Sequence, residues 1–166
     1  MINDENKLLY KALCYEEGHP RRTQHILKVY ALAKMLGQME GLSAEEQKIL
    51  NAAAILHDIP IKYCKEIYNG DACQENQKKE APDLVKTFLE ECNYAYDYFP
   101  QILELVEKHH DYACSKSKML QVLIEADLII NCYESRPTGE RLEEIKNLYE
   151  TSAGQELLNL CVKNIV

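Results

Sequence analysis

Apolar residues recur along most of the chain at the three- and four-residue spacing of amphipathic α-helices. This spacing predicts helices over residues 4–13, 21–38, 44–58, 61–68, 82–89, 102–109, 119–130, 141–149 and 155–162. No segment is a convincing strand, because none sustains the apolar–polar alternation that a half-buried strand shows. The pattern therefore predicts an all-α fold, a compact bundle of helices.

Turn and capping residues separate the predicted helices. Ser43-Ala44-Glu45-Glu46 is a capping box, the arrangement that closes the free N–H groups at a helix start. Pro82 is expected to open a helix, since a proline in the first turn leaves no hydrogen bond unmade. The polar segment 71–79 is predicted to be a loop, as is 94–98, which alternates but is short and lies close to Pro100.

The length of the chain, 166 residues, suits one domain. Hydrophobic residues make up 46% and charged residues 28%, the composition of a globular protein with a sizeable core. No repeat and no long linker divides the sequence, so we expect a single domain over residues 1–166. Its motif-bearing core lies at about 20–134, and C-terminal helices at about 138–163 are expected to pack on that core.

The charge balance narrows the classes of ligand. The chain has 27 acidic and 19 basic residues, a net charge of −8, which argues against nucleic acids and anionic membranes as partners. A small anionic substrate remains compatible, because it responds to the local field of a pocket. No apolar run approaches the roughly 20 residues of a membrane span.

Two further features indicate the compartment. Residues 1–6 are polar and acidic, without the basic start and apolar stretch of a secretion signal. The seven cysteines are odd in number, include no Cys-x-x-Cys pair and mostly lie in apolar helical segments. We interpret them as reduced thiols in the core, and we expect a cytoplasmic protein.

Four side chains able to bind a metal fall on three apolar helices: His25, His57, Asp58 and Asp127. A carboxylate among apolar residues is costly unless it is paired or binds a metal. Taken singly, each has a plain alternative: a hydrogen-bonded core histidine, a pair of residues ending a helix or, for Asp127, an ion pair with Arg22 or Lys62. Together, two imidazoles and two carboxylates suit one divalent cation of iron, manganese, cobalt, nickel or zinc.

The order and spacing of these residues resemble the H…HD…D signature of the HD-domain metal-dependent phosphohydrolases. The segments that carry the resemblance are Arg21-Arg22-Thr23-Gln24-His25, Ala53-Ala54-Ile55-Leu56-His57-Asp58-Ile59 and Glu125-Ala126-Asp127. The resemblance covers roughly residues 20–134. It implies an all-α fold and hydrolysis of a phosphate ester by metal-activated water. It also implies a divalent metal ion bound by His25, His57, Asp58 and Asp127, and magnesium joins the metals named above as a candidate.

Further elements resemble a small bacterial subfamily of HD proteins. A Gln-x-x-Glu-Gly-Pro element of that subfamily corresponds to residues 77–82, and a His-His-His-x-Tyr element corresponds to residues 108–112. This chain departs from the pattern twice, because Ala81 replaces the glycine and Lys108 replaces the first histidine of the triplet.

The resemblance also bears on the number of metal ions. HD proteins with two metals use an additional histidine at the position that corresponds to Gln77, and glutamine is a poor ligand. One ion is therefore expected. A second ion could be held by Glu80, His109 and His110, with Asp58 bridging the two ions. Alternatively, these groups could contact the ligands of the first ion without binding a metal themselves.

Histidines near residue 109 are candidates for proton transfer, beside the catalytic and ligating role that the resemblance gives to Asp58. His109 or His110 could protonate the leaving oxygen, since imidazole titrates near neutrality. Adjacent helical residues point about 100° apart, so only one of the two, His110 by preference, is expected to face the pocket. The alternative is that both lie at an exposed helix end, which favours a charged histidine.

Two cations are expected to hold the phosphate of a substrate. Arg22 lies one helical turn from His25, and its guanidinium can bind phosphate oxygens bidentately. Lys62 follows Asp58 closely and could meet the same group. The alternatives are that Arg22 pairs with Asp58 or Asp127, and that Lys62 is a solvated lysine.

We therefore expect a metal-dependent phosphohydrolase acting on a small phosphorylated molecule, with a nucleotide as the favoured substrate. One alternative is a non-catalytic metal- or ligand-binding HD module, which Gln77 and Lys108 would signal. A less favoured alternative is an HD-type di-iron oxygenase. Several tyrosines could line a pocket and stack on a base, or form the rim of the core: Tyr94, Tyr96, Tyr98 and Tyr112. The sequence leaves the oligomeric state open, a homodimer included.

Overall fold

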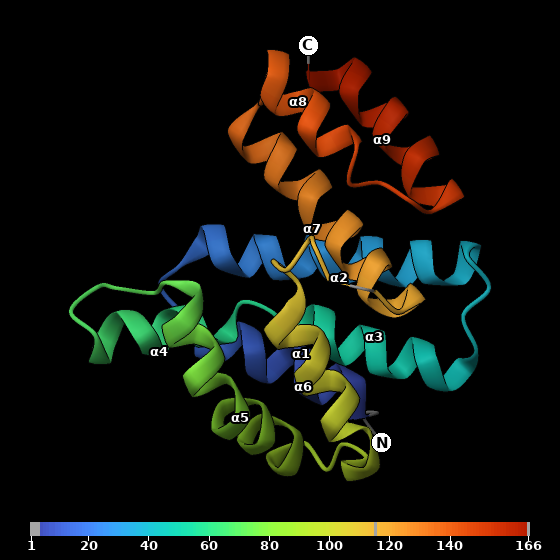
Figure 1. The fold of residues 1–166 in the computed structure, drawn as a ribbon. Coiled ribbons are helices and arrows are strands. Elements are labelled where there is room, and N and C mark those ends of the chain that lie inside the picture. Colours follow the sequence, from blue (N-terminus) through green and yellow to red (C-terminus); the bar gives the residue numbers. More distant parts are fainter. Residues whose placement is uncertain (1–3, 115, 166) are drawn as a thin grey trace.

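A computed structural model of the protein describes residues 4–114 and 116–165. Within these residues the chain is helical and contains no strand, so the predicted all-α fold is confirmed (Figure 1). The elements in chain order are α1 (Asp4–Tyr15), α2 (Pro20–Met39), α3 (Ala44–Leu56), α4 (Ile59–Ile67), α5 (Gln74–Glu91), the 3₁₀ turn η1 (Tyr96–Tyr98), α6 (Phe99–Lys108), α7 (Lys118–Ser135), α8 (Gly139–Lys146) and α9 (Ser152–Ile165).

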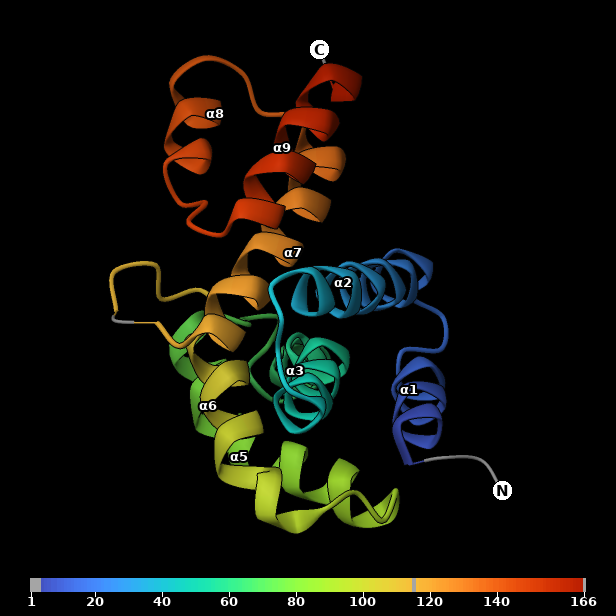
Figure 2. The same cartoon turned by 90° about the vertical axis from the view of Figure 1, so that its right-hand side faces the viewer.

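Helix α3 lies at the centre of the bundle and contacts α1, α2, α6 and α7. Helix α2 packs along α3 and against α7, whose far end is accompanied by α8 and α9 (Figure 2). Every side chain from Ile49 to Leu56 and from Leu120 to Ile130 is buried. Helices that are apolar on all sides belong in a core. Polar residues on α7 are therefore held inside the protein.

The predicted loop at 71–79 is wrong in its second part, because α5 begins at Gln74 and contains Pro82 in its interior. The Asp71 side chain accepts a hydrogen bond from the backbone N–H of Cys73 at 2.9 Å, and this turn precedes the helix. The residues that follow are mostly Gln, Glu and Lys, which are strong helix formers despite their polarity. The first turns of α5 consequently line the pocket described below.

The other predicted helices are confirmed with displaced ends. The predicted capping box forms both of its bonds: Glu46 N–H donates to Ser43 Oγ at 3.2 Å, and Ser43 N–H donates to Glu46 Oε2 at 2.8 Å. The segment expected as a loop at 94–98 includes the short turn η1. No helix in the described part of the chain combines the length and the apolar character that crossing a membrane requires.

A buried carboxylate joins the C-terminal helices to α7. Glu125 is fully buried and accepts hydrogen bonds from Gln121 Nε2 at 2.7 Å and from the backbone N–H groups of Glu150 at 2.7 Å and Thr151 at 2.9 Å. The Thr151 hydroxyl also donates to it. Gly154, in the first turn of α9, lies so close that a Cβ there would clash with the carboxylate. The start of α9 is thereby fixed against α7.

Candidate metal centre

The four predicted ligands come from three places in the bundle: His25 from α2, His57 and Asp58 from the junction of α3 and α4, and Asp127 from α7. The chain turns at this junction, and Pro60 follows in the first turn of α4. His25 Nε2 lies 3.0 Å from Asp127 Oδ1 and 3.5 Å from Asp58 Oδ2. His57 Nε2 also lies 3.5 Å from Asp58 Oδ2. The structure thus brings ligand atoms of His25, His57 and Asp58 within 4.8 Å of one another, and it places Asp127 against both imidazoles, 3.0 Å from His25 and 3.7 Å from His57.

The orientation of the two imidazole rings leaves lone pairs facing this point. His57 Nδ1 lies 2.8 Å from the carbonyl oxygen of Ala54, which can only accept, so Nδ1 carries the proton. His25 Nδ1 lies 3.3 Å from a carboxylate oxygen of Glu134 and carries the proton for the same reason. The two Nε2 atoms are 3.2 Å apart, and once their protons are lost their lone pairs face one another across a position that a cation would fill. The donor set fits a divalent metal ion.

Protons compete with a metal for this centre. Burial lowers the pKa of His57, but the negative charge of Asp58 and the hydrogen bond to Asp127 outweigh it and raise the pKa to about 9. Burial raises the pKa of Asp127, yet hydrogen bonds from His25 and His57 hold it well below its usual range. Because a metal binds unprotonated imidazole, an ion entering the centre displaces protons from the same nitrogen atoms.

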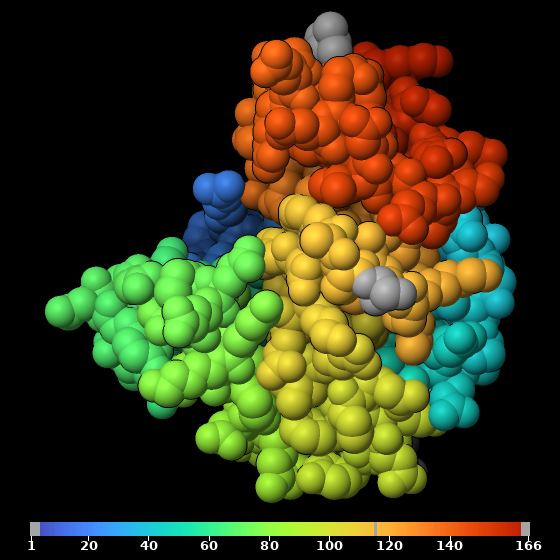
Figure 3. All heavy atoms as spheres, viewed as in Figure 1, coloured from blue at the N-terminus to red at the C-terminus, as the bar shows by residue number. Residues whose placement is uncertain are grey.

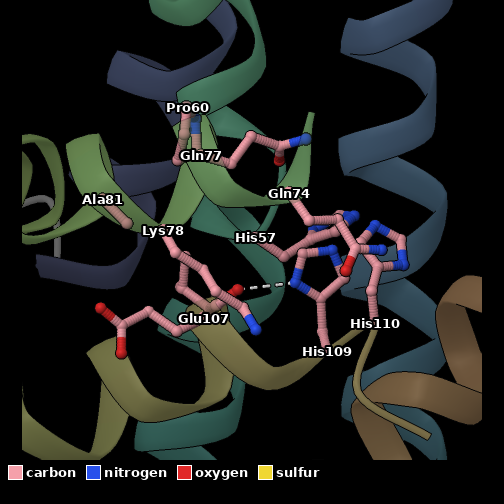
Figure 4. A pocket seen from close by; sticks show the side chains of 10 residues that line it. His57, Pro60, Gln74, Gln77, Lys78, Ala81, Glu107, His109 and His110 are labelled. Carbon is pink, nitrogen blue, oxygen red and sulfur yellow. Dashed lines mark hydrogen bonds between the residues drawn. The ribbon is translucent and has the colours of Figure 1, made fainter. Parts of the chain in front are cut away.

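Asp58 faces a second pair of histidines through its other oxygen. Asp58 Oδ1 lies 3.6 Å from Nε2 of His109, a side chain that is only 3% exposed. His109 Nδ1 lies 2.7 Å from the carbonyl oxygen of Val106, and Nε2 has no hydrogen-bond partner among the described residues (Figure 4). Ligand atoms of Asp58, His109 and His110 all lie within 4.8 Å of one another. This cluster is a second position suited to a cation, and it shares Asp58 with the first.

The expectation that only one of the two adjacent histidines faces the pocket is wrong. Both histidines line a small pocket between the start of α5 and the end of α6, together with His57, Gln74 and Gln77 (Figure 4). The ring centroids of His109 and His110 are 3.9 Å apart. Helix α6 ends at Lys108, and both residues lie in a tight turn beyond it, in which the Asp111 N–H donates to the carbonyl oxygen of Lys108 at 2.8 Å. Burial and the neighbouring His109 lower the pKa of His110 to about 4, which leaves its ring neutral at pH 7. Its role as an acid stays a prediction.

Gln77 and Glu80 lie on α5, but they have different surroundings. Gln77 lines the pocket with His109 and His110, and its amide donates to the carbonyl oxygen of Ala72 at 2.7 Å (Figure 4). Glu80 accepts a hydrogen bond from the Tyr68 hydroxyl at 2.6 Å. Among the described residues, neither group of candidate metal ligands includes Glu80. The second cluster therefore consists of Asp58 and the two histidines alone.

A cleft opens beside the centre, next to His25 and Asp58. Its charged and polar walls include His19, Arg21, Arg22, Lys65, Asn131 and Glu134. Arg22 donates its Nε–H to Glu16 at 2.6 Å, and the Glu16 side chain is 1% exposed. The alternative that Arg22 pairs with Asp58 is thus replaced by a pair with Glu16. This bond uses Nε, so the terminal nitrogens of the guanidinium are left for a ligand of the cleft.

The structure places Lys62 away from this cleft. Its ammonium group donates to the carbonyl oxygen of Tyr15 at 2.5 Å and lies 4.8 Å from the centroid of the Tyr15 ring. Lys65, one turn later on α4, lines the cleft in its place. The residue that ends α1 therefore binds Lys62. Such a contact between distant segments cannot be predicted from the local sequence pattern.

Two residues of α7 that the sequence analysis did not identify contact the candidate metal ligands. Asn131 donates to Asp127 Oδ2 at 2.9 Å, and Glu134 contacts His25. Arg21 holds the other oxygen of Glu134 at 3.0 Å. Asp127, Asn131 and Glu134 are spaced by four and then three residues, so they share one helix face. That spacing was the available signal in the sequence.

Replacing Glu134 with glutamine is expected to weaken metal binding about 10- to 100-fold, because the carboxylate fixes the tautomer and orientation of His25. Titration against a competing chelator measures the affinity. Glu90→Gln, an exposed change on α5, is the matched control. Equal affinities in Glu134→Gln and the wild type would show that the contact with His25 does not orient the ring.

The fold and the centre define an α-helical protein with two imidazoles and two carboxylates converging in its core. The family model of the HD domain matches residues 22–145 of the 166-residue chain. The chain therefore belongs to the HD-domain family, which consists largely of metal-dependent hydrolases and whose members bind divalent metals. Searches of curated proteins and of solved structures gave no match.

Proposed function

We propose that this protein is a metal-dependent phosphohydrolase that cleaves a phosphate ester of a small molecule, with a nucleotide as the favoured substrate. The observation that supports this most is the convergence of two imidazole lone pairs and two carboxylates beside a cleft lined by cations. Nucleic acids and membranes are not proposed as partners, since the chain carries a net charge of −8. We place the protein in the cytoplasm.

The residues divide the chemistry among them. His25, His57, Asp58 and Asp127 would hold a divalent ion, which would supply Lewis-acid chemistry for activating water and polarising a phosphoryl oxygen. Arg22 binds the non-bridging phosphate oxygens through its terminal nitrogens, and Lys65 also lines the cleft. His110 is neutral, so its remaining N–H can hydrogen-bond the leaving oxygen.

The test begins with protein freed of metal by a chelator and reloaded separately with manganese, iron, cobalt, nickel, zinc or magnesium. Metal content per chain is measured by elemental analysis, and phosphate release is followed for a panel of nucleoside monophosphates and sugar phosphates. We expect at least one loaded form to release phosphate. Metal binding with no turnover of any ester would instead favour a non-catalytic binding module.

The number and identity of the bound ions distinguish the phosphohydrolase from the remaining alternative, a di-iron oxygenase. The shared Asp58, with one oxygen facing each cluster, is the observation that favours room for two ions. Two irons per chain without phosphate release would favour the di-iron oxygenase. One ion, or two ions with hydrolysis, supports the phosphohydrolase.

Arg22→Ala is expected to raise KM for a phosphate ester about 10- to 100-fold while the metal content stays unchanged, since a hydrogen bond to a charged group is lost. The change also leaves the buried Glu16 carboxylate without its cation. The double variant with Glu16→Gln removes that stranded charge and is expected to recover stability but not KM. Recovery of KM in the double variant would show that Arg22 serves only Glu16.

A further inference from the structure

A second cleft lies on the other side of Asn131, between the segment after α6, helix α7 and helix α8. The residues that matter for the argument are Tyr112, Leu128, Asn131, Pro137, Arg141 and Ile145. In Figure 3, α8 in orange lies above the yellow segment that ends α6 and precedes α7. None of the roles assigned so far uses this cleft.

The walls of this cleft differ from those of the charged cleft. Leu128 and Ile145 are only 4% and 6% exposed, so they form an apolar floor. Tyr112 is half-buried against the core and offers a ring. Arg141 is 68% exposed at its side chain, and among the described residues its ion pair is with Glu144, its neighbour on the same helix, at 3.1 Å. Exposed pairs of this kind are weak, so the guanidinium remains available to a ligand.

Two residues of the cleft lie next to the metal centre. Asn131 lines both clefts and donates to Asp127. The Tyr112 ring stands perpendicular to the His110 ring, with centroids 6.5 Å apart. Burial raises the pKa of Tyr112, the charge of Asp127 adds to this and Arg141 opposes it, so the phenol lies within the field of both.

We propose that this cleft is the subsite for a planar heteroaromatic ring in the organic part of the substrate. This inference rests on the proposed phosphohydrolase function and names the group that its substrate carries. The charged cleft takes the phosphate, and the apolar floor beside Asn131 takes the ring. Tyr112 stacks on the ring face, as aromatic side chains do on nucleobases, and Arg141 meets its electronegative edge.

The test compares esters that differ only in the ring. The 5′-monophosphates of adenosine and cytidine are assayed against ribose 5-phosphate with the metal-loaded full chain. We expect the wild type to favour at least one nucleotide about tenfold or more in kcat/KM, the range that base stacking supplies. Tyr112→Leu is expected to raise KM for that nucleotide about tenfold and to leave ribose 5-phosphate unchanged. Tyr112→Phe, which keeps the ring, is expected to retain the preference.

Each test variant has a matched control elsewhere on the surface. Tyr10→Leu on α1 is the control for Tyr112→Leu, and Lys146→Gln is the control for Arg141→Gln, both on α8. Equal kcat/KM for the nucleotides and ribose 5-phosphate would overturn the subsite while leaving the proposed function intact, as would an equal loss for all three in Tyr112→Leu. If none is hydrolysed, the proposed function fails for these esters. Calorimetric binding of the same compounds then decides the subsite: tighter binding of a nucleotide that Tyr112→Leu abolishes supports it, and equal binding overturns it.

Discussion

Replacing Asp58 with alanine is expected to lower metal affinity by more than about 100-fold and to abolish metal-dependent hydrolysis. This loss of affinity should exceed the 10- to 100-fold loss that is typical when a residue hydrogen-bonded to a metal ligand is replaced. Asp58 stands 3.5 Å from Nε2 of both His25 and His57, and its second oxygen lies 3.6 Å from His109. One substitution therefore affects both candidate ion positions.

The measurement is metal content per chain by elemental analysis, with helix content followed by circular dichroism. Asp83→Ala, an exposed carboxylate on α5, is the matched control and is expected to keep its metal. The helical signal of Asp58→Ala should persist, because Asp58 lies at a junction between helices and outside the apolar core. Full metal content in folded Asp58→Ala would overturn the assignment of the centre.

Replacing Glu125 with alanine is expected to lower the free energy of unfolding by about 3–5 kcal/mol. The carboxylate accepts bonds from Gln121, from two backbone N–H groups and from the Thr151 hydroxyl. A buried donor left unsatisfied costs about 1–3 kcal/mol, and water entering the vacated space offsets part of the total. Alanine leaves these donors without an acceptor. For a chain of this size the melting temperature should fall by roughly 10 °C.

Urea denaturation followed by circular dichroism measures the change. Glu156→Ala, an exposed acidic residue on α9, is the control and is expected to change stability by less than about 0.5 kcal/mol. A similarly small effect of Glu125→Ala would mean that water replaces the carboxylate and that the C-terminal helices do not depend on it.

The grouping of the candidate ligands could be predicted from the sequence because polar groups in apolar helices carry a strong signal. Asp127 follows and precedes apolar residues that are all buried, and burial of a carboxylate demands a partner. His25, His57 and Asp58 added the imidazoles and the second carboxylate. The all-α fold followed from the regular spacing of apolar residues, which dominates local structure in a helical protein.

The parts that were missed depend on contacts between distant segments. Closeness to Asp58 in the sequence indicates Lys62 as a phosphate ligand, but its ammonium group donates to the carbonyl oxygen of Tyr15 at 2.5 Å. The start of α5 was read as a loop because its residues are polar and Pro82 suggested a later beginning. In both cases the local composition was ambiguous and packing decided the outcome.

The shared carboxylate has a consequence for the order in which ligands bind. Asp58 and Asp127 give the centre two negative charges, while the nearby Glu134 and Glu16 are each paired with an arginine. One divalent ion makes the centre neutral, and a second ion leaves a surplus of two positive charges. A phosphate monoester dianion cancels that surplus. If an ion occupies the position beside His109, its binding and the binding of a phosphate ester would therefore promote one another by an equal factor, a reciprocal thermodynamic linkage.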